Sequence, residues 1–362
     1  MFSAEKLAIR LNRIFRNLLF HFIFWGLSFL FYVFLTDDFE FLRIHLNFFN
    51  IEDFYWVIFS ISAIISLFFI ILDGLFSDRF LRFFPRRLMI FFKSLLYLAS
   101  VFIFLIIAAN PSFTIFSDRQ YERILNLLPE WNLRFIRFLV YFYLSGFMNN
   151  FLKGVFKIVG RGNFQGWVFG MYNKPREQER IFMFIDMKSS TTIAEKLQHK
   201  KYSHLVQDAF NDLSIVDNYQ GQIYKYLGDG AIITWRLKDG LRNNNFLRAF
   251  YAYQRVINRR KKYYTRKYGI VPKFKAGVHA GKVMVLLVGK IRRDISYNGD
   301  TINTAARIEA MCNEYKQNLL ISGDLYNLMG DEKDFNIKNV GNIKLKGKRK
   351  SVNIYQVKMK KT

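Results

Sequence analysis

The sequence predicts a domain of four transmembrane helices followed by a soluble domain of the α+β (α/β sandwich) class. Four apolar stretches in the first half are long enough to cross a bilayer. Residues 1–152 carry 14 Lys and Arg against 11 Asp and Glu, a charge of +3, whereas residues 153–362 carry 40 against 17, a charge of +23. Strand and helix patterns alternate in this second half. The expected divisions are a membrane domain at 1–152, a linker at 153–180 and a soluble domain at 181–362.

The predicted spans lie at 17–35, 55–76, 89–109 and 136–152. Each is close to the roughly 20 residues that cross about 30 Å of hydrocarbon. Basic residues precede the first span and fill the second loop, whereas the first loop is acidic. The positive-inside rule therefore places both termini and the soluble domain in the cytoplasm. We expect a multi-pass protein of the cell (inner) membrane, in contact with the lipid bilayer. The first span is too long for a signal-peptide core and is expected to be retained.

Composition excludes several other classes of protein. Aromatic residues make up 18% of the chain, which excludes a disordered chain. The one Cys excludes an intrachain disulfide framework and a cysteine-based zinc site. No nucleic-acid motif accompanies the basic charge, so nucleic acid is not an expected partner. The basic run at 259–267 is expected to be a solvated helix face, with contact to anionic lipid as the alternative. His21 in the first span is expected to pack or to lie at the interface, with metal or haem binding as the alternative.

The soluble half begins after a linker whose four glycines argue against one continuous helix, so any helix in it is expected to be short and to lie around 174–180. Two short strands flank residues 228–230, Gly-Asp-Gly, and predict a hairpin. The expected elements, in order, are strand 181–187, helix 191–218, strands 222–227 and 231–235, helix 245–268, one or two strands within 273–289, helix 300–315 and closing strands up to 358.

Two carboxylates are placed where they could bind metal. Asp186 ends an apolar strand, and Ser190 and Thr191 open the next helix, which puts a metal ligand beside a candidate anion site for the substrate. Asp229 lies at the hairpin tip. Ser and Thr also cap helices, and Asp-Gly also forms turns, so each motif alone has a structural alternative. Together the two carboxylates could share a pair of Mg²⁺ ions for in-line attack on phosphorus.

Two further pairs of residues are predicted to share a face. Lys225 precedes Asp229 by four residues, so on a strand both side chains would point the same way. Asn303 and Arg307 are four apart on a predicted helix. They flank two alanines, so this helix is expected to approach another element closely.

Five segments then occur in order: IFMFIDMKSSTTIAEKL, IYKYLGDGAIITW, FKAGVHAGKV, ISYNGDTINTAARIEAM and IKLKGKRKSVNIYQV. Together they resemble the catalytic domain of the class III nucleotidyl cyclases, the adenylyl and guanylyl cyclases. The resemblance covers about residues 178–358, half of the chain.

The resemblance implies residues for metal and phosphate binding. Asp186 and Asp229 match the two metal-binding aspartates of the family, and the backbone carbonyl of Met187 matches a further metal ligand. The implied cofactor is Mg²⁺ or Mn²⁺, two ions per active site. Lys346 matches the lysine that binds the triphosphate.

The resemblance also implies residues for the nucleoside. Lys225 matches the purine-reading lysine, and Ser296 falls where adenylyl cyclases carry Asp, or Thr or Ser in one bacterial subgroup. Asn303 matches the ribose-orienting asparagine and Arg307 the arginine that stabilises the transition state. A lysine can donate only to an acceptor such as adenine N1, whereas guanine N1 bears a proton. Guanylyl cyclases usually carry Glu at the position of Lys225, so ATP is the expected substrate.

The expected function is a membrane-bound adenylate cyclase that makes cyclic AMP and pyrophosphate from ATP. The alternatives are a membrane receptor or scaffold whose cyclase-like domain binds nucleotide without turnover, and a guanylate cyclase. Family active sites combine aspartates from one subunit with lysine, asparagine and arginine from the other, so a head-to-tail homodimer is expected. What ligand or partner the membrane domain binds, and whether bicarbonate regulates the enzyme, stay open.

Overall fold

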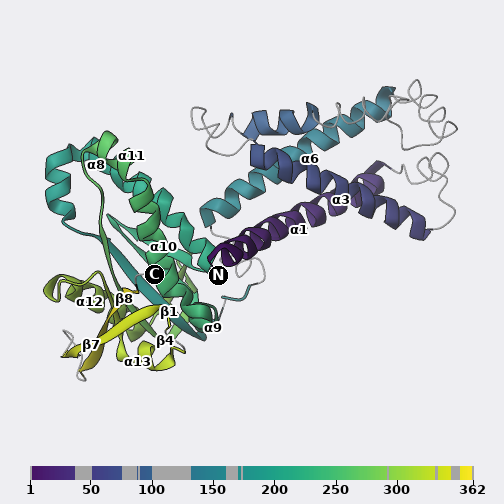
Figure 1. Cartoon of the computed structure of the whole chain (residues 1–362). Coiled ribbons are helices and arrows are strands. Elements are labelled where there is room, and N and C mark those ends of the chain that lie inside the picture. The colour runs from purple at the N-terminus through teal and green to yellow at the C-terminus, as the bar shows by residue number, and fades with distance from the viewer. Residues whose placement is uncertain are drawn as a thin grey trace. The chain divides into compact units, whose positions relative to one another are not determined.

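The computed structural model of the chain describes residues 2–36, 51–75, 88, 90–99, 132–159, 170–172, 174–291, 293–330, 333–343 and 351–360. The chain divides into two compact units, Met1–Val159 and Gly160–Thr362 (Figure 1). Each unit has its own core.

The described part of the first unit is helical. Its helices are α1 (Phe2–Thr36), α3 (Ile51–Leu75), a shorter helix at Ile90–Ala99, and α6 (Asn132–Val159). Each of the four supplies one ring to an aromatic core of Trp25, Phe69, Tyr97 and Phe142. The Trp25 ring stacks on Phe142 with centroids 4.7 Å apart, and the Phe69 and Tyr97 centroids lie 4.2 Å apart. The four helices therefore pack around one shared core.

The described residues test only part of the four-span prediction. One segment, Asn17–Thr36, is long and apolar enough to cross a membrane, and it coincides with the first predicted span. Shorter apolar helices at Ser62–Asp73 and Ile90–Ala99 lie within the second and third predicted spans. Residues 100–109 lie outside the described residues. α6 includes the fourth predicted span and continues to Val159, so the predicted linker begins as helix. The four-helix membrane domain stays a prediction.

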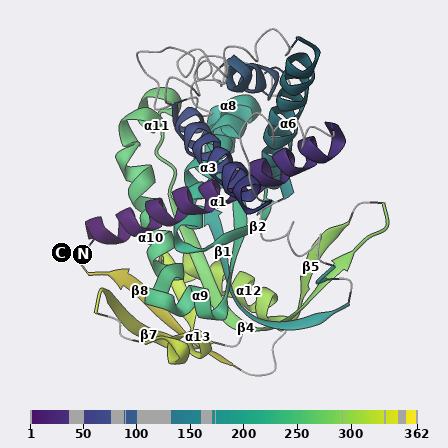
Figure 2. The same cartoon turned by 90° about the vertical axis from the view of Figure 1, so that its right-hand side faces the viewer.

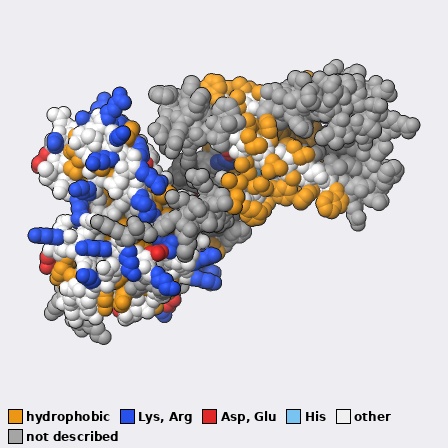
Figure 3. Space-filling model, viewed as in Figure 1, with side chains coloured by type: hydrophobic (Ala, Val, Ile, Leu, Met, Phe, Trp, Pro, Cys, Tyr) orange, Lys and Arg blue, Asp and Glu red, His pale blue; other side chains and the backbone are white. Residues whose placement is uncertain are grey.

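The first unit is apolar on its surface and partly polar inside. Large apolar side chains are exposed on its described helices, among them Phe31, Phe34, Trp56, Ile71 and Leu133. Figure 3 shows hydrophobic side chains, in orange, over the described surface of this unit. Buried polar side chains include those of Ser62, Ser66, Ser94, Asn149 and Asn150. A helix at the surface of a water-soluble protein turns its polar face outward. The surface of this unit is therefore suited to an apolar environment.

One carboxylate connects all four helices of this unit. Asp73 on α3 accepts a hydrogen bond from the Tyr97 hydroxyl at 2.7 Å and forms an ion pair with Lys153 on α6. Its Oδ2 also lies 3.4 Å from Nε2 of His21 on α1. His21 and Tyr97 are buried, and Asp73 and Lys153 are half-buried. His21 thus packs inside the helices and contacts the central carboxylate.

We expect Asp73→Ala to lower the stability of the helical unit by about 3 kcal/mol, because three helices lose their shared acceptor on α3. The check is thermal unfolding of the full chain in detergent. Lys153→Met should also destabilise, and the double variant should lose less than the sum, because both changes remove the same ion pair. Ser60→Ala, whose exposed hydroxyl contacts only its own helix at the Trp56 carbonyl, serves as the control. Additive losses would contradict this coupling.

The second unit is built on an eight-stranded sheet with the order β2-β3-β1-β4-β6-β8-β7, and β5 pairs with β4. The strands are β1 (Arg176–Met187), β2 (Gln222–Leu227), β3 (Gly230–Arg236), β4 (Phe274–Val288), β5 (Asp294–Asn298), β6 (Leu319–Ser322), β7 (Phe335–Ile343) and β8 (Val352–Met359). β4 pairs in parallel with β6, and the other pairs are antiparallel. In Figure 2 the β4–β5 hairpin extends beyond the body of the sheet.

Helices cover both faces of this sheet. They are α8 (Ser190–Leu213), the 3₁₀ helix η3 (Ser214–Tyr219), α9 (Leu237–Leu241), the 3₁₀ helix η4 (Arg242–Asn244), α10 (Asn245–Arg259), α11 (Lys261–Tyr268), α12 (Asp300–Glu314) and α13 (Gly323–Leu328). Met183 and Ile185 of β1 belong to the core that includes α8 and α10. Phe182 belongs to a second core with Ala305 of α12. Strand alternation therefore puts Asp186 on the α12 face.

Three elements differ from the sequence-based expectation. The helix expected around 174–180 is wrong, because β1 begins at Arg176 and pairs with β4 from its first residue. An ion pair of 2.9 Å between Glu177 and Lys282 joins these two strands. The expected helix 245–268 is divided at Arg260 into α10 and α11. α8 bends at Gln198, which has φ 59° and ψ 165°, although neither Gly nor Pro marks the bend.

The close approach predicted for the helix of Asn303 is confirmed. α12 packs directly on β4, and Ala305 is fully buried. A Cβ at Gly277 of β4 would overlap the backbone of Glu309 on α12. Gly277 thus allows the helix backbone to touch the strand, which fixes the position of α12 on the sheet.

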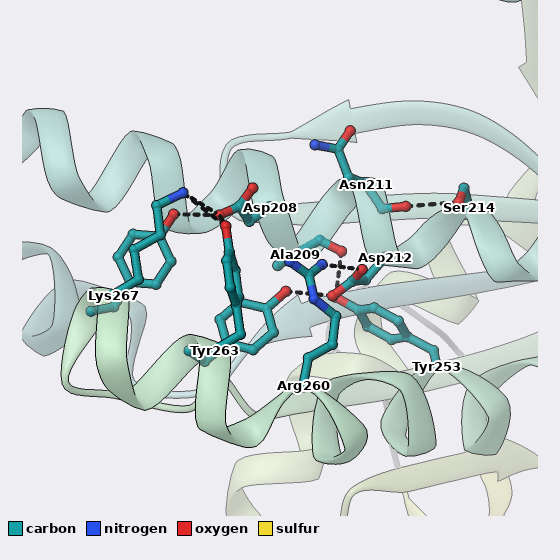
Figure 4. A network of polar contacts seen from close by, with 11 residues as sticks. Asp208, Ala209, Asn211, Asp212, Ser214, Tyr253, Arg260, Tyr263 and Lys267 are labelled. Carbon is teal, nitrogen blue, oxygen red and sulfur yellow. Dashed lines mark hydrogen bonds and ion pairs between the residues drawn. The ribbon is translucent and has the colours of Figure 1, made fainter. Parts of the chain in front are cut away.

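Two carboxylates of α8 join this helix to α11 (Figure 4). Asp208 Oδ2 accepts hydrogen bonds from the side chains of Tyr263 at 2.6 Å, Lys267 at 2.8 Å and Tyr268 at 2.5 Å. Asp212 accepts one from Tyr264 at 2.6 Å and pairs with Arg260. Two members of the basic run at 259–267 therefore form internal ion pairs, and four others are exposed: Arg259, Lys261, Lys262 and Arg266.

The Asp208 network predicts a pH-dependent contribution to stability. Burial raises the pKa of the Asp208 carboxyl, but hydrogen bonds from Lys267, Tyr263 and Tyr268 outweigh burial, so the pKa lies below the ordinary value of 3.8. A lowered folded-state pKa means that the contribution is complete at neutral pH and is lost as the pH falls below about 4.

We expect Asp208→Asn to lower the stability of the folded protein by about 2 kcal/mol at pH 7. The difference from the wild type should shrink as the pH falls from about 4 to 2. Melting curves of both proteins across this pH range check the prediction. Asp334→Asn, which changes the more exposed pair with Arg248, is the matched control. A constant difference at every pH would contradict the prediction.

Candidate active site

The two predicted metal ligands lie on neighbouring elements of the sheet. Asp186 is the penultimate residue of β1, and Asp229 lies in the turn between β2 and β3. A Cβ at Gly230 would lie 2.9 Å from the Ile185 carbonyl oxygen and 3.2 Å from Asp186 Oδ1, so glycine lets the turn contact β1. Because Asp229 lies in the turn, strand alternation does not relate its direction to that of Lys225. The predicted hairpin is confirmed, and it brings Asp229 toward Asp186.

The electrostatics of the site show that Asp229 lies close enough to act on the Asp186 carboxyl. Burial raises the pKa of the Asp186 carboxyl above its ordinary value, and the charge of Asp229 raises it further. The Lys275 ammonium opposes both effects. Two neighbouring carboxylates favour binding of a cation, which offsets their repulsion.

Lys275 and Glu309 also belong to this site, although the sequence analysis did not identify them. Lys275 lies opposite Asp186 in the β1–β4 pairing, and its Nζ lies 3.4 Å from Asp186 Oδ2. The same ammonium lies 2.7 Å from Glu309 Oε1 on α12. Burial raises the pKa of the Glu309 carboxyl, Lys275 lowers it, and Asp186 and Asp229 raise it again. The sequence signal that could have identified Lys275 is a single lysine within a predicted strand of small and apolar residues.

The residues present fit a divalent metal ion. Asp229 Oδ2 is buried and has no hydrogen-bond partner among the described residues, which is costly for an anionic oxygen unless a cation is bound. Within those residues no group of three or more His, Cys, Asp and Glu could bind a metal. Mg²⁺ is commonly bound through one or two carboxylates together with substrate phosphates. Asp186, Asp229 and the Met187 carbonyl, at the end of β1, would need such oxygens to complete the coordination.

The start of α8 lies beside this carboxylate pair. Ser190 is the first residue of α8 and Thr191 the second, and Ser189 before them has φ 56°. The Tyr202 hydroxyl forms a hydrogen bond with Ser190. Burial raises the pKa of Tyr202, and the charges of Asp229 and Asp186 raise it further, so this tyrosine also lies near the site.

A second group of predicted residues gathers around β2 and β5. Lys225 Nζ lies 3.5 Å from Asp294 Oδ2, and Ser296 donates a hydrogen bond to Asn298 Oδ1 at 2.9 Å. Burial lowers the pKa of the Lys225 ammonium, but Tyr224 and Asp294 outweigh burial and the net pKa is raised. Lys225 is therefore charged at neutral pH. The structure thus brings Lys225 close to the strand of Ser296, as the base-binding prediction requires.

Asn303 and Arg307 lie on α12 away from its buried face. Asn303 is exposed and Arg307 is half-buried. Neither is among the residues of α12 that enter the core: Thr301, Thr304, Ala305, Ile308 and Cys312. Among the described residues, Arg307 forms no ion pair with Asp186 or Asp229. Lys346 lies outside the described residues.

Comparison with known families decides the class of this unit. The family model described as the adenylate and guanylate cyclase catalytic domain matches residues 172–359. The chain belongs to this family. The resemblance to class III nucleotidyl cyclases is therefore confirmed, and the second unit contains the cyclase domain.

Similar proteins share this cyclase domain. Residues of the chain are 30% identical over 199 positions to adenylate cyclase 2 of Rhizobium meliloti (strain 1021), covering 55% of each chain. Adenylate cyclase of Anabaena cylindrica is 27% identical over 184 positions, covering 49% of this chain and 36% of the relative. The crystal structure of the adenylyl cyclase CyaB from P. aeruginosa is 23% identical, with a TM-score of 0.46, covering 52% of this chain and 97% of that chain. The chain thus spans only about half, or less, of the length of these curated relatives.

Proposed function

We propose that the protein is a membrane-bound adenylate cyclase that converts ATP to 3′,5′-cyclic AMP and pyrophosphate. The observation that carries the proposal is the pair Asp186 and Asp229, in which the buried Oδ2 of Asp229 has no hydrogen-bond partner within the part of the chain that the structure describes. Membership of the cyclase family and similarity to proteins named adenylate cyclase support the reaction. The charged Lys225 supports ATP as the substrate, because its ammonium can donate to adenine N1.

In this proposal the predicted site residues have the following roles in the reaction. The ribose 3′-hydroxyl attacks the α-phosphorus while pyrophosphate leaves. Asp186 and Asp229 would hold Mg²⁺ or Mn²⁺ ions, which would lower the pKa of that hydroxyl and neutralise the leaving phosphates. Asn303 orients the ribose, and Arg307 donates hydrogen bonds to the oxygens on which charge develops. The start of α8 at Ser190 and Thr191 offers backbone N–H groups to phosphate. Lys346 is proposed to bind the triphosphate.

The active site is proposed to form across a head-to-tail homodimer. Among the described residues, the side chains of Asn303 and Arg307 form no hydrogen bond or ion pair, so both are available to a nucleotide bound to the partner's aspartates. The β2–β3 and β4–β5 hairpins carry exposed apolar side chains. A second copy of the chain could cover these side chains, which are Tyr226, Leu227, Met284, Val288 and Ile291.

The membrane location is proposed from the first unit. Its exposed apolar side chains, the buried polar side chains beside its aromatic core and one segment long enough to span a bilayer support insertion. Asp73 lies toward the end of the second predicted span, Lys153 directly follows the fourth, and His21 lies early in the first. Their contact agrees with helices that alternate in direction, which would leave both termini and the cyclase domain in the cytoplasm.

The test is product formation by detergent-solubilised full-length protein with Mn²⁺, given ATP and GTP in separate assays. Cyclic AMP from ATP is the expected product. Cyclic GMP as the main product would favour the guanylate cyclase alternative. Neither product from folded, dimeric protein that still binds nucleotide would favour the receptor or scaffold alternative. The Asp229→Asn variant, purified in parallel, measures contaminating activity.

A further inference from the structure

The base-binding region contains an acidic residue that the family resemblance did not indicate. Asp294 lies on β5 two residues before Ser296, and its Oδ2 lies 3.5 Å from Lys225 Nζ on β2. The two strands are not neighbours in the sheet, because β2 pairs with β3 and β5 pairs with β4. The side chains of Lys225 and Asp294 are 43% and 49% exposed, so a ligand could still reach both.

Ser296 is less suited than Asp294 to accept a hydrogen bond from a base. Its hydroxyl donates to Asn298 Oδ1 at 2.9 Å. Asp294, Ser296 and Asn298 alternate along β5, so their side chains share one face of the strand. An ionised carboxylate is an acceptor only, and hydrogen bonds to it are stronger than those to a neutral hydroxyl. Asp294 therefore supplies the strong acceptor beside Lys225.

We propose that Asp294 determines base specificity by accepting a hydrogen bond from the 6-amino group of adenine while Lys225 donates to N1. This inference rests on the proposed adenylate cyclase function and adds a residue to its substrate site. Adenine presents an amino donor next to the N1 acceptor, which complements an acceptor next to a donor. Guanine presents O6 in place of the amino group, so the carboxylate would face another acceptor, and a protonated N1 would face Lys225. The pair thus favours adenine and disfavours guanine.

The simpler role for Asp294 is that of a counter-ion that positions Lys225. The two roles differ in their dependence on the substrate. A positioning residue affects every purine triphosphate that Lys225 contacts at N1. A residue that binds the 6-amino group affects only substrates that carry this group.

The probe that separates these roles is purine riboside triphosphate, which retains N1 and has hydrogen in place of the 6-amino group. We expect the wild-type protein to prefer ATP over this analogue by about 10-fold or more in kcat/KM, from one charge-assisted hydrogen bond. Asp294→Ala should reduce this preference to about 2-fold or less, because it should lower kcat/KM for ATP and leave kcat/KM for the analogue unchanged. Asp294→Asn, which keeps a neutral acceptor, should retain an intermediate preference. Both variants should also use GTP relatively better.

The control is Glu177→Ala, which removes the acid of another exposed Lys–carboxylate pair, with Lys282, at 2.9 Å. It should leave the preference unchanged. An equal preference for the two substrates in the wild type would overturn the proposal without any variant. The proposal would also be overturned if Asp294→Ala lowered kcat/KM equally for both substrates, or for neither of them. A wild-type protein that forms no cyclic nucleotide from any substrate would instead refute the proposed function, and this inference with it.

Discussion

Asp229→Asn is expected to reduce cyclic nucleotide formation by about 1,000-fold or more, since metal binding contributes several kcal/mol to transition-state stabilisation. The substitution preserves the shape of the side chain and removes the charge of a buried oxygen that has no hydrogen-bond partner among the described residues. If Asp229 served only the turn, Asn would replace it with little effect, because both residues favour turns.

Two measurements distinguish these roles. The first is turnover with Mn²⁺ and ATP, and the second is the shift in melting temperature when Mn²⁺ and a non-cyclisable ATP analogue are added. The wild type should be stabilised by this addition and Asp229→Asn should not, because a ligand stabilises only the state that binds it. Glu177→Gln, a carboxamide change at the other end of the neighbouring strand, is the control. A folded Asp229→Asn protein with more than about a tenth of wild-type turnover would contradict the metal role.

A mixture of two inactive variants is expected to recover activity. Asp186→Ala and Arg307→Ala should each be inactive alone, because each homodimer lacks one half of both sites. Random pairing in an equal mixture makes about half of the dimers mixed, and one of the two sites in each mixed dimer is intact, so about a quarter of wild-type activity should return. The structural reason is that Arg307 contacts neither carboxylate of its own chain among the described residues.

The matched control is the double variant Asp186→Ala with Arg307→Ala, mixed with Asp186→Ala. No pairing of these chains rebuilds a site, so the mixture should stay inactive. Cross-linking or light scattering must show that all variants dimerise. If dimers form and the complementing mixture stays inactive, each site lies within a single chain, and the head-to-tail arrangement is wrong.

Much of the cyclase domain could be predicted because its sequence signals are local. An apolar run that ends at Asp186 and a Gly-Asp-Gly turn at Asp229 are each visible within ten residues, and both predicted strands and the hairpin are present. The role of each aspartate depended on the family resemblance, because the same patterns also serve turns and caps. The placement of Lys225 near the strand of Ser296 agrees with that resemblance.

The other features of the site and the fold depend on contacts between distant parts of the chain, which sequence periodicity does not show. Lys275 meets Glu309 only after α12 packs on β4, and Asp294 meets Lys225 across strands that do not pair. The helix expected around 174–180 failed because pairing with β4 outweighed local propensity. The bend of α8 at Gln198 could not be predicted, because neither Gly nor Pro lies at the bend. All of these features depend on tertiary contacts, whereas a single sequence shows only local structural preferences.

The central position of β4 sets the order in which the cyclase domain can fold. β1 ends at Met187, but its long partner β4 begins only at Phe274. A ribosome that adds 5–20 residues per second would take roughly 10 s to make the chain between them. The β2–β3 hairpin emerges earlier and can cover one edge of β1. The other edge, along the apolar Ile181–Met187 segment, must wait for β4. Newly made chains therefore pass through a stage with an open apolar strand edge, when binding of chaperones to that edge would limit aggregation.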